Sequence, residues 1–344
     1  MIIKEKKALQ FTIKCLIKIG LKKNDAEHVS KLLVKADMSN HFSHGILRII
    51  QYFHMTKKKI YSTIKKPKII NNGSYLAING NRSFGQIAMK FACQNIKKLN
   101  NDIQITSVTN TGHIGRLSDY SELLINYGYI NFIFCNGGGP NTSIYPSRER
   151  IVGTNPFAFG IQVNKTKNLI VDFATSMIAE GKITLAKLNK EKLSTKPIIS
   201  KKGTFSKKLN DLYDGGSLRT FGDIKGSAFS LVNEVVGGLL ISSNNPINSN
   251  YLDGNNCLII SFKKKLFGKN KIFEKKFKKL KNKIKKSKKI KTNRKINFYL
   301  PGEIEDKNYH KSKKKGINYN DNLIMKLNKF AENELNISKN YFLN

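Results

Sequence analysis

The chain has 344 residues, a length that favours about two domains and allows a sizeable buried core. Its formal net charge is +39, and only seven of its 62 basic residues are arginine. No apolar run reaches the roughly 20 residues that a transmembrane helix needs, and the first residues lack an apolar stretch followed by a small-residue cleavage site. We therefore expect a cytoplasmic protein without a membrane partner.

Apolar residues recur at helical or strand-like intervals from the N-terminus to residue 262. A strand, a glycine-bearing loop, a helix and a strand follow one another from 103 to 135, which predicts an α/β fold. We expect mobile or variable connections at 189–215 and 263–299. The predicted helices are 5–19, 24–36, 43–53, 86–99, 117–127, 176–188, 226–241 and a C-terminal helix capped by Asn320, and the predicted strands are 75–78, 103–108, 129–135, 157–163, 169–173 and 257–262.

The densest basic run, 263–295, places apolar residues at near-helical intervals. This pattern predicts an amphipathic surface helix with a lysine-coated outer face. Lysine is also abundant elsewhere, together with asparagine and isoleucine, as a strong A/T codon bias would produce, so the charge needs no nucleic-acid partner. Binding of a polyanion such as nucleic acid remains the alternative.

The four cysteines lie far apart, each in an apolar context. This spacing favours buried free thiols in a reducing compartment over a disulfide framework or a zinc site. The residues are Cys15, Cys93, Cys135 and Cys257.

The segment 43–48 places His44 and Arg48 four residues apart at the start of a predicted helix. Residues at i and i+4 share one helical face, so this surface offers a proton donor or acceptor beside a bidentate carboxylate clamp. A solvated arginine at a helix start is the simpler alternative.

A second candidate segment, 111–116, joins a predicted strand to a predicted helix and carries His113 beside Gly112. Small residues let a ligand approach the backbone, and an imidazole with a pKa near 6.5 is a proton shuttle at neutral pH. A lone loop histidine can equally be structural.

Weaker signals lie at 153–160, at 172–176 and at Lys225. The first two place hydroxyl and amide groups at strand ends, and 172–176 opens onto a predicted helix N-terminus, which attracts phosphate but can also be a simple N-cap. Lys225 stands in a glycine-flanked turn and could contact phosphate or carboxylate, or simply end the turn. The glycine fingerprint of the Rossmann fold, the Walker A lysine and the G-x-S-x-G elbow are all missing.

His41 and His44 are spaced as H-x-x-H, but neither a cysteine nor a third histidine stands near them. We therefore expect no metal site. A metal-dependent hydrolase built on His41, His44 and His113 is a third hypothesis.

Taken in order, these segments resemble the type-2 malate/L-lactate dehydrogenase family, which includes ureidoglycolate and sulfolactate dehydrogenases. The stretch around His113 is most similar to the branch of hydroxycarboxylate dehydrogenase B. The matching stretches are Ala36-Asp37, Ser43-His44-Gly45 with Arg48, 111–117, 153–160, 172–176 with Gly181-Lys182, Lys225-Gly226 and Pro301-Gly302-Glu303.

This resemblance implies a homodimeric oxidoreductase that moves a hydride between NAD or NADP and the 2-position of a small 2-hydroxy or 2-oxo acid. It also implies an α/β fold other than the Rossmann fold, with a helical N-terminal part and a mixed-sheet core. We expect a substrate-side helical region at 1–75 with the C-terminal helix 318–336 packed on it, an NAD(P)-binding core at 76–262 and a lysine-rich segment at 263–299.

In the family, the histidine at the position of His113 is the proton acceptor, and those matching His44 and Arg48 lie at the active site. The chemistry agrees, because a base must remove the hydroxyl proton while the hydride leaves the same carbon. We expect His113 to be that base, Arg48 to clamp the carboxylate and His44 to orient the substrate oxygen. The residues expected at the cofactor are Ser43, Asn155, Asp172, Ala174, Thr175, Ser176, Lys182, Lys225, Gly302 and Glu303.

Overall fold

A seven-stranded sheet forms the centre of the computed structural model, which describes residues 1–344 except 249, 269, 291–296, 339–340 and 343–344. The strand order is β2-β3-β4-β11-β5-β6-β7, with β3 and β4 parallel and the other neighbours antiparallel. A Rossmann sheet is mostly parallel, so this mixed sheet confirms the prediction of an α/β fold other than the Rossmann fold. The strands are β2 (Lys68–Asn72), β3 (Leu76–Asn79), β4 (Ile103–Thr111), β5 (Tyr129–Gly137), β6 (Phe157–Asn164), β7 (Lys167–Phe173) and β11 (Asn255–Lys263).

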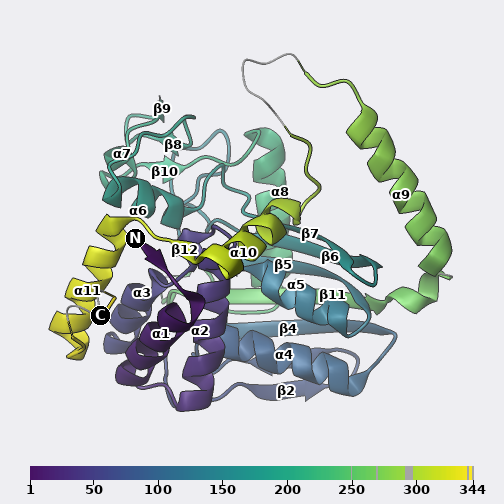
Figure 1. Cartoon of the computed structure of the whole chain (residues 1–344), viewed down its shortest axis with the longest axis horizontal. Helices are drawn as coiled ribbons and strands as arrows, with labels where there is room; N and C mark the ends of the chain where they lie inside the picture. The colour runs from purple at the N-terminus through teal and green to yellow at the C-terminus, as the bar shows by residue number, and fades with distance from the viewer. Residues whose placement is uncertain (249, 269, 291–296, 339–340, 343–344) are drawn as a thin grey trace.

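A helical layer lies beside the sheet and joins the two ends of the chain (Figure 1). It consists of α1 (Glu5–Ile19), α2 (Lys23–Met38), α3 (Arg48–Lys57) and α11 (Asp321–Leu335), whose apolar faces share one buried core. The Asn320 side chain caps α11 by accepting the Asn322 N–H at 2.9 Å, as the sequence predicts. A short pairing of β1 (Ile2–Ile3) with β12 (Ile317–Asn318) ties the N-terminus to the residues before α11.

A second core lies between one face of the sheet and the helices α4 (Gly85–Leu99) and α5 (Leu117–Asn126). Alternate residues of a strand point to opposite faces, and Ile133 and Cys135 of β5 belong to this core. Cys135 and Cys257 are opposite each other on β5 and β11. All four cysteines are buried and free, as the sequence predicts.

The other face of β5 receives α8 (Ile224–Glu234) and the π-helical turn η2 (Val235–Leu239). Gly237 and Gly238 allow this close approach, because a Cβ would lie 2.8 Å from the Phe134 backbone at the first and 2.2 Å from the Asn136 side chain at the second. The buried Glu234 carboxylate accepts hydrogen bonds from the amides of Asn136 at 3.0 Å and Asn155 at 2.8 Å. The single acid of this apolar helix therefore serves as an internal anchor.

The segment 189–215, which the sequence predicts as a mobile or variable connection, contains secondary structure. It contributes two strands of a small three-stranded sheet, and its Ile198 and Leu212 form a third core with Ile183 and Leu218. Strands of two residues are too short to show periodicity, which is why the sequence pattern missed them. The elements are α6 (Glu180–Leu188), β8 (Ile198–Ile199), β9 (Phe205–Ser206), α7 (Asn210–Tyr213) and β10 (Ser217–Leu218).

Helix α10 (Glu303–Lys315) was also missed, because it lacks an apolar stripe. Its first turn carries Glu303, Glu305 and Asp306, and its last turn carries three lysines. This charge order complements the helix dipole and is the signal that could have identified the helix.

The lysine-rich segment forms the 3-10 turn η3 (Lys264–Phe267) and the helix α9 (Asn270–Lys286), which stands at the edge of the molecule beyond β6 (Figure 1). The part of the predicted segment at 291–296 lies outside the described residues. Near the predicted boundary at residue 75, β2 pairs with β3, so the hairpin spans that boundary. Among the helices that the structure describes, none combines the length and apolar character needed to cross a bilayer.

The packing of α11 on the N-terminal helices predicts a specific stability difference. Leu327 is fully buried in the shared core, whereas Met325 on the same helix is 61% exposed. We expect Leu327→Ala to lower the free energy of unfolding by about 2–5 kcal/mol, because it leaves a cavity. Met325→Ala should change it by less than about 0.5 kcal/mol. Urea unfolding measures both, and equal losses at the two positions would contradict the packing.

Candidate functional site

Two half-buried histidines, far apart in the sequence, stack beside each other. His44 ends the 3-10 turn η1 (Phe42–His44), and His113 lies in the loop between β4 and α5. Their ring centroids are 5.7 Å apart with an angle of 28° between the ring planes. The helical layer and the sheet therefore each supply one imidazole to the same place.

The segment from Ser43 to Arg48 is not the continuous helix that the sequence predicts. Gly45 is extended, with φ −90° and ψ −152°, and α3 begins only at Arg48. The Ile46 N–H donates to Asp37 Oδ2 at 3.0 Å instead of to a helical carbonyl. A side-chain acceptor thus replaces the first helical bond, and His44 and Arg48 do not share a helical face.

The Asp37 carboxyl group supports the break in the helix at Gly45. A Cβ on Gly45 would lie 1.5 Å from Asp37 Oδ1, so glycine alone lets the loop rest on the carboxyl group. The same carboxyl group accepts the Tyr319 hydroxyl at 2.8 Å. Burial raises the pKa of Asp37 to about 8, against the lowering effect of these two hydrogen bonds. A buried, largely protonated acid therefore fixes the position of His44.

The Arg48 guanidinium is oriented but carries no acidic partner. Its Nε donates to the Ser43 carbonyl at 2.7 Å, and its Nη1 donates to Gln51 Oε1 at 2.6 Å. A Cβ on Gly181 would lie 2.8 Å from Nη2, so this glycine lets α6 pack against the guanidinium. No carboxylate of the described chain lies within ion-pair distance of Arg48. An external carboxylate can therefore take that role.

Tyr52 is the residue that the sequence analysis missed. Its hydroxyl lies 3.1 Å from His113 Nδ1 and accepts the Gln86 side-chain amide at 2.6 Å. The Tyr61 hydroxyl accepts the His113 backbone N–H at 2.9 Å. Tyr52 stands four residues after Arg48 on α3, so helical spacing could have identified it. Gln86 and Tyr61 carry no comparable local signal.

Both imidazoles are held neutral. Burial lowers the pKa of His113 well below its ordinary value, and the nearby charge of Arg48 lowers it further. Burial also lowers the pKa of His44, with Arg48 again the next cause. A neutral imidazole can accept a proton, so each ring is in the state that a general base requires.

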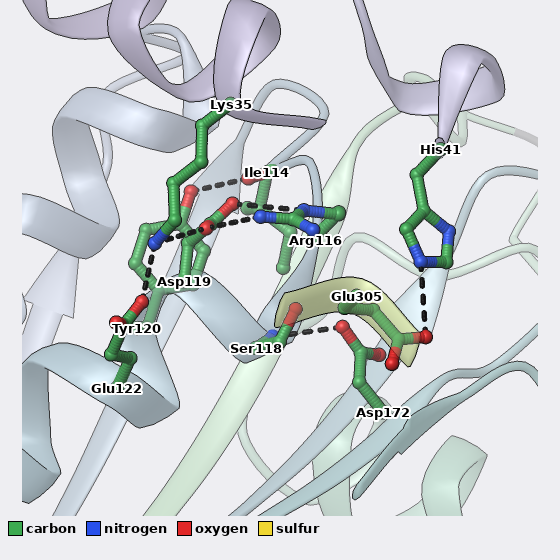
Figure 2. A network of polar contacts seen from close by, with 10 residues as sticks. All are labelled: Lys35, His41, Ile114, Arg116, Ser118, Asp119, Tyr120, Glu122, Asp172 and Glu305. Carbon is green, nitrogen blue, oxygen red and sulfur yellow. Dashed lines mark hydrogen bonds and ion pairs between the residues drawn. The ribbon is translucent and has the colours of Figure 1, made fainter. Parts of the chain in front are cut away.

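A buried charge network holds the loop that follows His113 (Figure 2). The Arg116 guanidinium donates to Asp119 Oδ1 at 2.6 Å, and Lys35 of α2 lies 3.1 Å from the same oxygen. Burial by itself would raise the pKa of Asp119, but the two cations lower it. The Tyr120 hydroxyl donates to the Ile114 carbonyl, the residue next to His113. The network therefore fixes the loop to both α5 and α2.

The predicted cofactor segment 172–176 leaves β7 as a fixed loop. Asp172 Oδ2 accepts the Ser118 N–H at 2.8 Å near the start of α5 (Figure 2). Thr175 donates both its N–H and its hydroxyl to the Thr154 carbonyl at 2.9 Å. The helix predicted to open at Ser176 begins instead at Glu180, because the Ser176 hydroxyl bonds the Ile178 carbonyl and its backbone pairs with Thr220.

The segment that carries Lys225 lies against this loop. The Phe221 N–H donates to the Thr175 carbonyl at 2.9 Å, and the Phe221 ring packs on Phe173. Phe173 is 37% exposed. Lys225, in the first turn of α8, is exposed and has no acidic partner among the residues described. An open aromatic surface and an unpaired cation therefore occur on adjoining segments, beside the predicted residue Ala174.

Of three other predicted cofactor residues, one has internal partners, one lines a separate cavity and one lies beside the histidines. The Asn155 amide donates to Glu234, and its oxygen accepts the Gly137 N–H at 3.4 Å. Lys182 lines a cavity of about 740 Å³ with Met1, Phe42 and Tyr319, and the two stacked histidines do not line this cavity. Ser43, in contrast, is in contact with both His44 and Arg48 through its hydroxyl and carbonyl.

Glu303 begins α10 directly after Gly302, which lies against Ile170 of β7. Its carboxylate pairs with Lys167 and with Lys281 of α9 at 2.6 Å. Burial would raise the pKa of Glu303, but these lysines and a backbone N–H lower it to about 2. The carboxylate therefore joins α9, α10 and β7.

The metal-dependent hydrolase hypothesis has no geometry to support it. His41 Nε2 lies 3.3 Å from Glu305 of α10 (Figure 2). Across the described ranges, no three histidine, cysteine, aspartate or glutamate side chains are arranged to hold a metal ion.

Comparison with known proteins identifies the class. Residues 3–328 match the malate/L-lactate dehydrogenase family. The L-sulfolactate dehydrogenase of Methanocaldococcus jannaschii is 30% identical over 348 residues, with 98% of each chain covered. The malate dehydrogenase of Pyrococcus abyssi is 30% identical over 262 residues, which are 72% of this chain and 71% of that protein.

Solved structures of a sulfolactate dehydrogenase and a malate dehydrogenase have the same fold as this chain. That of the M. jannaschii sulfolactate dehydrogenase has a TM-score of 0.83 at 26% identity over all of both chains. The malate dehydrogenase of Entamoeba histolytica shares the fold, with a TM-score of 0.86 at 22% identity over 98% of each chain. The protein is thus an oxidoreductase of the 2-hydroxy acid dehydrogenase class. It belongs to the malate/L-lactate dehydrogenase family, which confirms the resemblance seen in the sequence.

The Tyr52–His113 contact predicts a defect in turnover. Tyr52→Phe removes one hydrogen bond to the imidazole, so we expect kcat to fall about five- to tenfold, the kinetic equivalent of about 1–1.4 kcal/mol. Tyr129→Phe is the matched control, because Tyr129 is also buried and its hydroxyl bonds the Asn101 carbonyl. Steady-state kinetics measures both variants, and an unchanged kcat in Tyr52→Phe would contradict this role.

Proposed function

We propose that this protein is an NAD(P)-dependent dehydrogenase that interconverts a small 2-hydroxy acid and the corresponding 2-oxo acid. The observation that carries the proposal is the guanidinium of Arg48, unpaired within the described chain, beside the stacked imidazoles of His44 and His113. A carboxylate and a neighbouring oxygen on one small molecule match these groups. The names of the relatives, malate and sulfolactate dehydrogenases, support the same substrate class.

Each of the three side chains has one role. Arg48 binds the substrate carboxylate, since its planar fork suits bidentate pairing and its Nε and Nη1 are already fixed within the protein. His113 removes the proton from the 2-hydroxyl group during oxidation and returns it to the 2-oxo oxygen during reduction. His44 donates to or accepts from the same oxygen and orients it.

Tyr52 controls which nitrogen of His113 can act. Nδ1 lies 3.1 Å from the Tyr52 hydroxyl, whereas Nε2 has no hydrogen-bond partner in the described part of the chain. When Nδ1 carries the hydrogen and donates it to Tyr52, Nε2 keeps its lone pair and accepts the substrate proton. The Gln86 amide fixes the Tyr52 oxygen in turn.

Substrate binding also adjusts the base. The charge of Arg48 lowers the pKa of both histidines in the free protein. A substrate carboxylate on Arg48 offsets that charge and raises the pKa of His113 towards its ordinary value. The imidazole therefore becomes a stronger base when the molecule it deprotonates is bound.

The loop beside Lys225 fits a nicotinamide dinucleotide. Lys225 offers an unpaired cation for the pyrophosphate, and the exposed ring of Phe173 offers an apolar surface to a base. At Gly222 a Cβ would meet no described atom within 4 Å, so the backbone there is open to a ligand. NAD(P), when bound, exchanges a hydride with the substrate carbon. Ala174, Asp172 and Lys182 remain predicted contacts, and Glu303 would act through the segments it joins.

Removing the proposed base tests the function. We expect His113→Ala to lower kcat by about 10²–10⁴, because general acid–base catalysis is lost. The dissociation constants of NADH and NADPH, measured by fluorescence, should stay within about twofold of the wild-type values, because the imidazole acts on the substrate proton. Turnover is assayed with pyruvate, hydroxypyruvate, oxaloacetate and phenylpyruvate, each with NADH and with NADPH. His54→Ala, an exposed histidine on α3, is the control. Equal loss of turnover and binding would refute the assignment.

We also propose that the protein is a homodimer that pairs through the outer face of α8 and η2. Residues 226–262 contain no lysine or arginine, although the chain carries +39 charges. Two such chains repel each other, so the surface that follows Lys225, formed by this stretch without lysine or arginine, is where a second copy can approach. The face is apolar along its length, with exposed fractions of 40–72%, and consists of Ile224, Leu231, Val232, Val235, Leu239 and Leu240.

Charge introduced on this face should separate the subunits. We expect the wild type to elute at about twice its chain mass of 39.0 kDa, and Leu231→Lys with Val235→Lys to elute as a monomer. Light scattering after size exclusion measures the mass. Ile64→Lys with Ile70→Lys is the control, because these residues are exposed on other segments. A wild-type monomer, or a variant that remains dimeric, would contradict this interface.

A further inference from the structure

The turn η3 and the helix α9 carry a higher density of positive charge than the rest of the chain. Lysine makes up more than half of residues 263–290, and the only acid there is Glu274. Three of these lysines, Lys276, Lys279 and Lys283, are exposed on α9. Lys265 pairs with Asp102 at 2.8 Å, and Lys281 pairs with Glu303.

These two ion pairs attach the segment to the body and set its orientation. Lys281 connects α9 to the start of α10, and Lys264 lies over the Phe273 ring at 4.9 Å. Phe273 and Phe277 are half-buried and pack against each other, with ring centroids 6.0 Å apart. One side of α9 is thus held by the protein, and the opposite side is presented outward at the edge of the molecule (Figure 1).

The outward side combines lysines with large apolar side chains. Positions i, i+4, i+7, i+8 and i+11 share a helical face, and on α9 these positions are occupied by residues that are all exposed. Ile272 is 55% exposed and Leu280 54%, and at the end of the preceding turn Phe267 is 71% exposed. We call this set the α9 outer face: Ile272, Lys276, Lys279, Leu280 and Lys283.

We propose that the α9 outer face docks reversibly on a membrane surface that contains anionic lipid. Lysines attract the negative headgroups, and their long stems let the ammonium groups remain at that level while Ile272 and Leu280 enter the acyl boundary. Helices that lie in a membrane interface have this combination of a strongly basic face, apolar residues and low net hydrophobicity. The protein would be peripheral to the membrane, held by one helix, contrary to the expectation from the sequence that it has no membrane partner.

The apolar residues distinguish a membrane from a nucleic acid. Phosphate contacts require cations alone, and a leucine or isoleucine between the lysines contributes nothing to them. The α9 outer face also lacks arginine, asparagine, glutamine and aromatic residues, the side chains that read or stack bases. A lipid surface uses both kinds of side chain that are present.

Co-sedimentation with vesicles tests the proposal on the full-length protein. The vesicles are phosphatidylcholine alone and phosphatidylcholine mixed with phosphatidylglycerol. We expect binding only to the mixed vesicles, and its loss as salt is raised. Lys276→Gln, Lys279→Gln and Lys283→Gln together should weaken binding at least about tenfold. The matched control is Lys201→Gln, Lys202→Gln and Lys207→Gln, three exposed lysines on the β8–β9 segment.

A second variant separates insertion from charge attraction. Ile272→Ser with Leu280→Ser should weaken vesicle binding several-fold with the lysines intact, since less apolar area is buried. Ile64→Ser with Ile70→Ser is its control, because both residues are exposed elsewhere. Circular dichroism shows that each variant is folded.

Four outcomes would overturn the proposal: no binding to mixed vesicles, an equal loss in the lysine control, unaltered binding in the Ile272/Leu280 variant, or equal losses in both serine variants. Binding to random duplex DNA that survives in the serine variant while vesicle binding is absent would assign the face to nucleic acid instead.

Discussion

The hydrogen bond between Tyr52 and His113 Nδ1 is the contact on which the site depends, because it crosses from the helical layer to the sheet. Tyr52 belongs to the core shared by α1, α2, α3 and α11, and the residue after His113, Ile114, belongs to the core beneath α4 and α5. The Gln86 amide of α4 bonds the same tyrosine oxygen. The two histidines therefore meet only where two separately packed layers meet, and their distance is set by how these layers dock.

Charge is distributed unevenly over the surface, and this distribution gives different parts of the molecule different physical properties. The outer face of α8 and η2 presents aliphatic residues, and residues 226–262 carry no lysine or arginine, whereas α9 presents lysines with few acids nearby. The proposed dimer uses the first surface, where two chains at +39 repel each other least, and the proposed membrane contact uses the second. At the candidate site, the charge of the Arg48 guanidinium, which has no acidic partner among the described residues, lowers the pKa of both histidines.

Close approach of the backbone decides how the functional side chains are placed. Gly45 rests on the Asp37 carboxyl group and breaks the helix that the spacing of His44 and Arg48 predicts. Gly181 lets α6 contact the Arg48 guanidinium. Both glycines could be read in the sequence, but the partner that each one admits lies in another element. The structure brings His44 and Arg48 together without the shared helical face that their spacing predicts.

The sequence by itself determined the α/β class, the long helices, most strands and the Asn320 cap, because apolar periodicity and capping depend on neighbours within a few residues. The order of its matching stretches determined the family. The sequence missed β8, β9 and β10, whose two-residue strands carry no period, and α10, whose signal is charge order alone. Only the tertiary structure decided how His44 and His113 stack, that Tyr52 bonds His113, and that the Asn155 and Glu303 side chains have partners inside the protein. These contacts join residues of different layers, and no local pattern encodes how two layers dock.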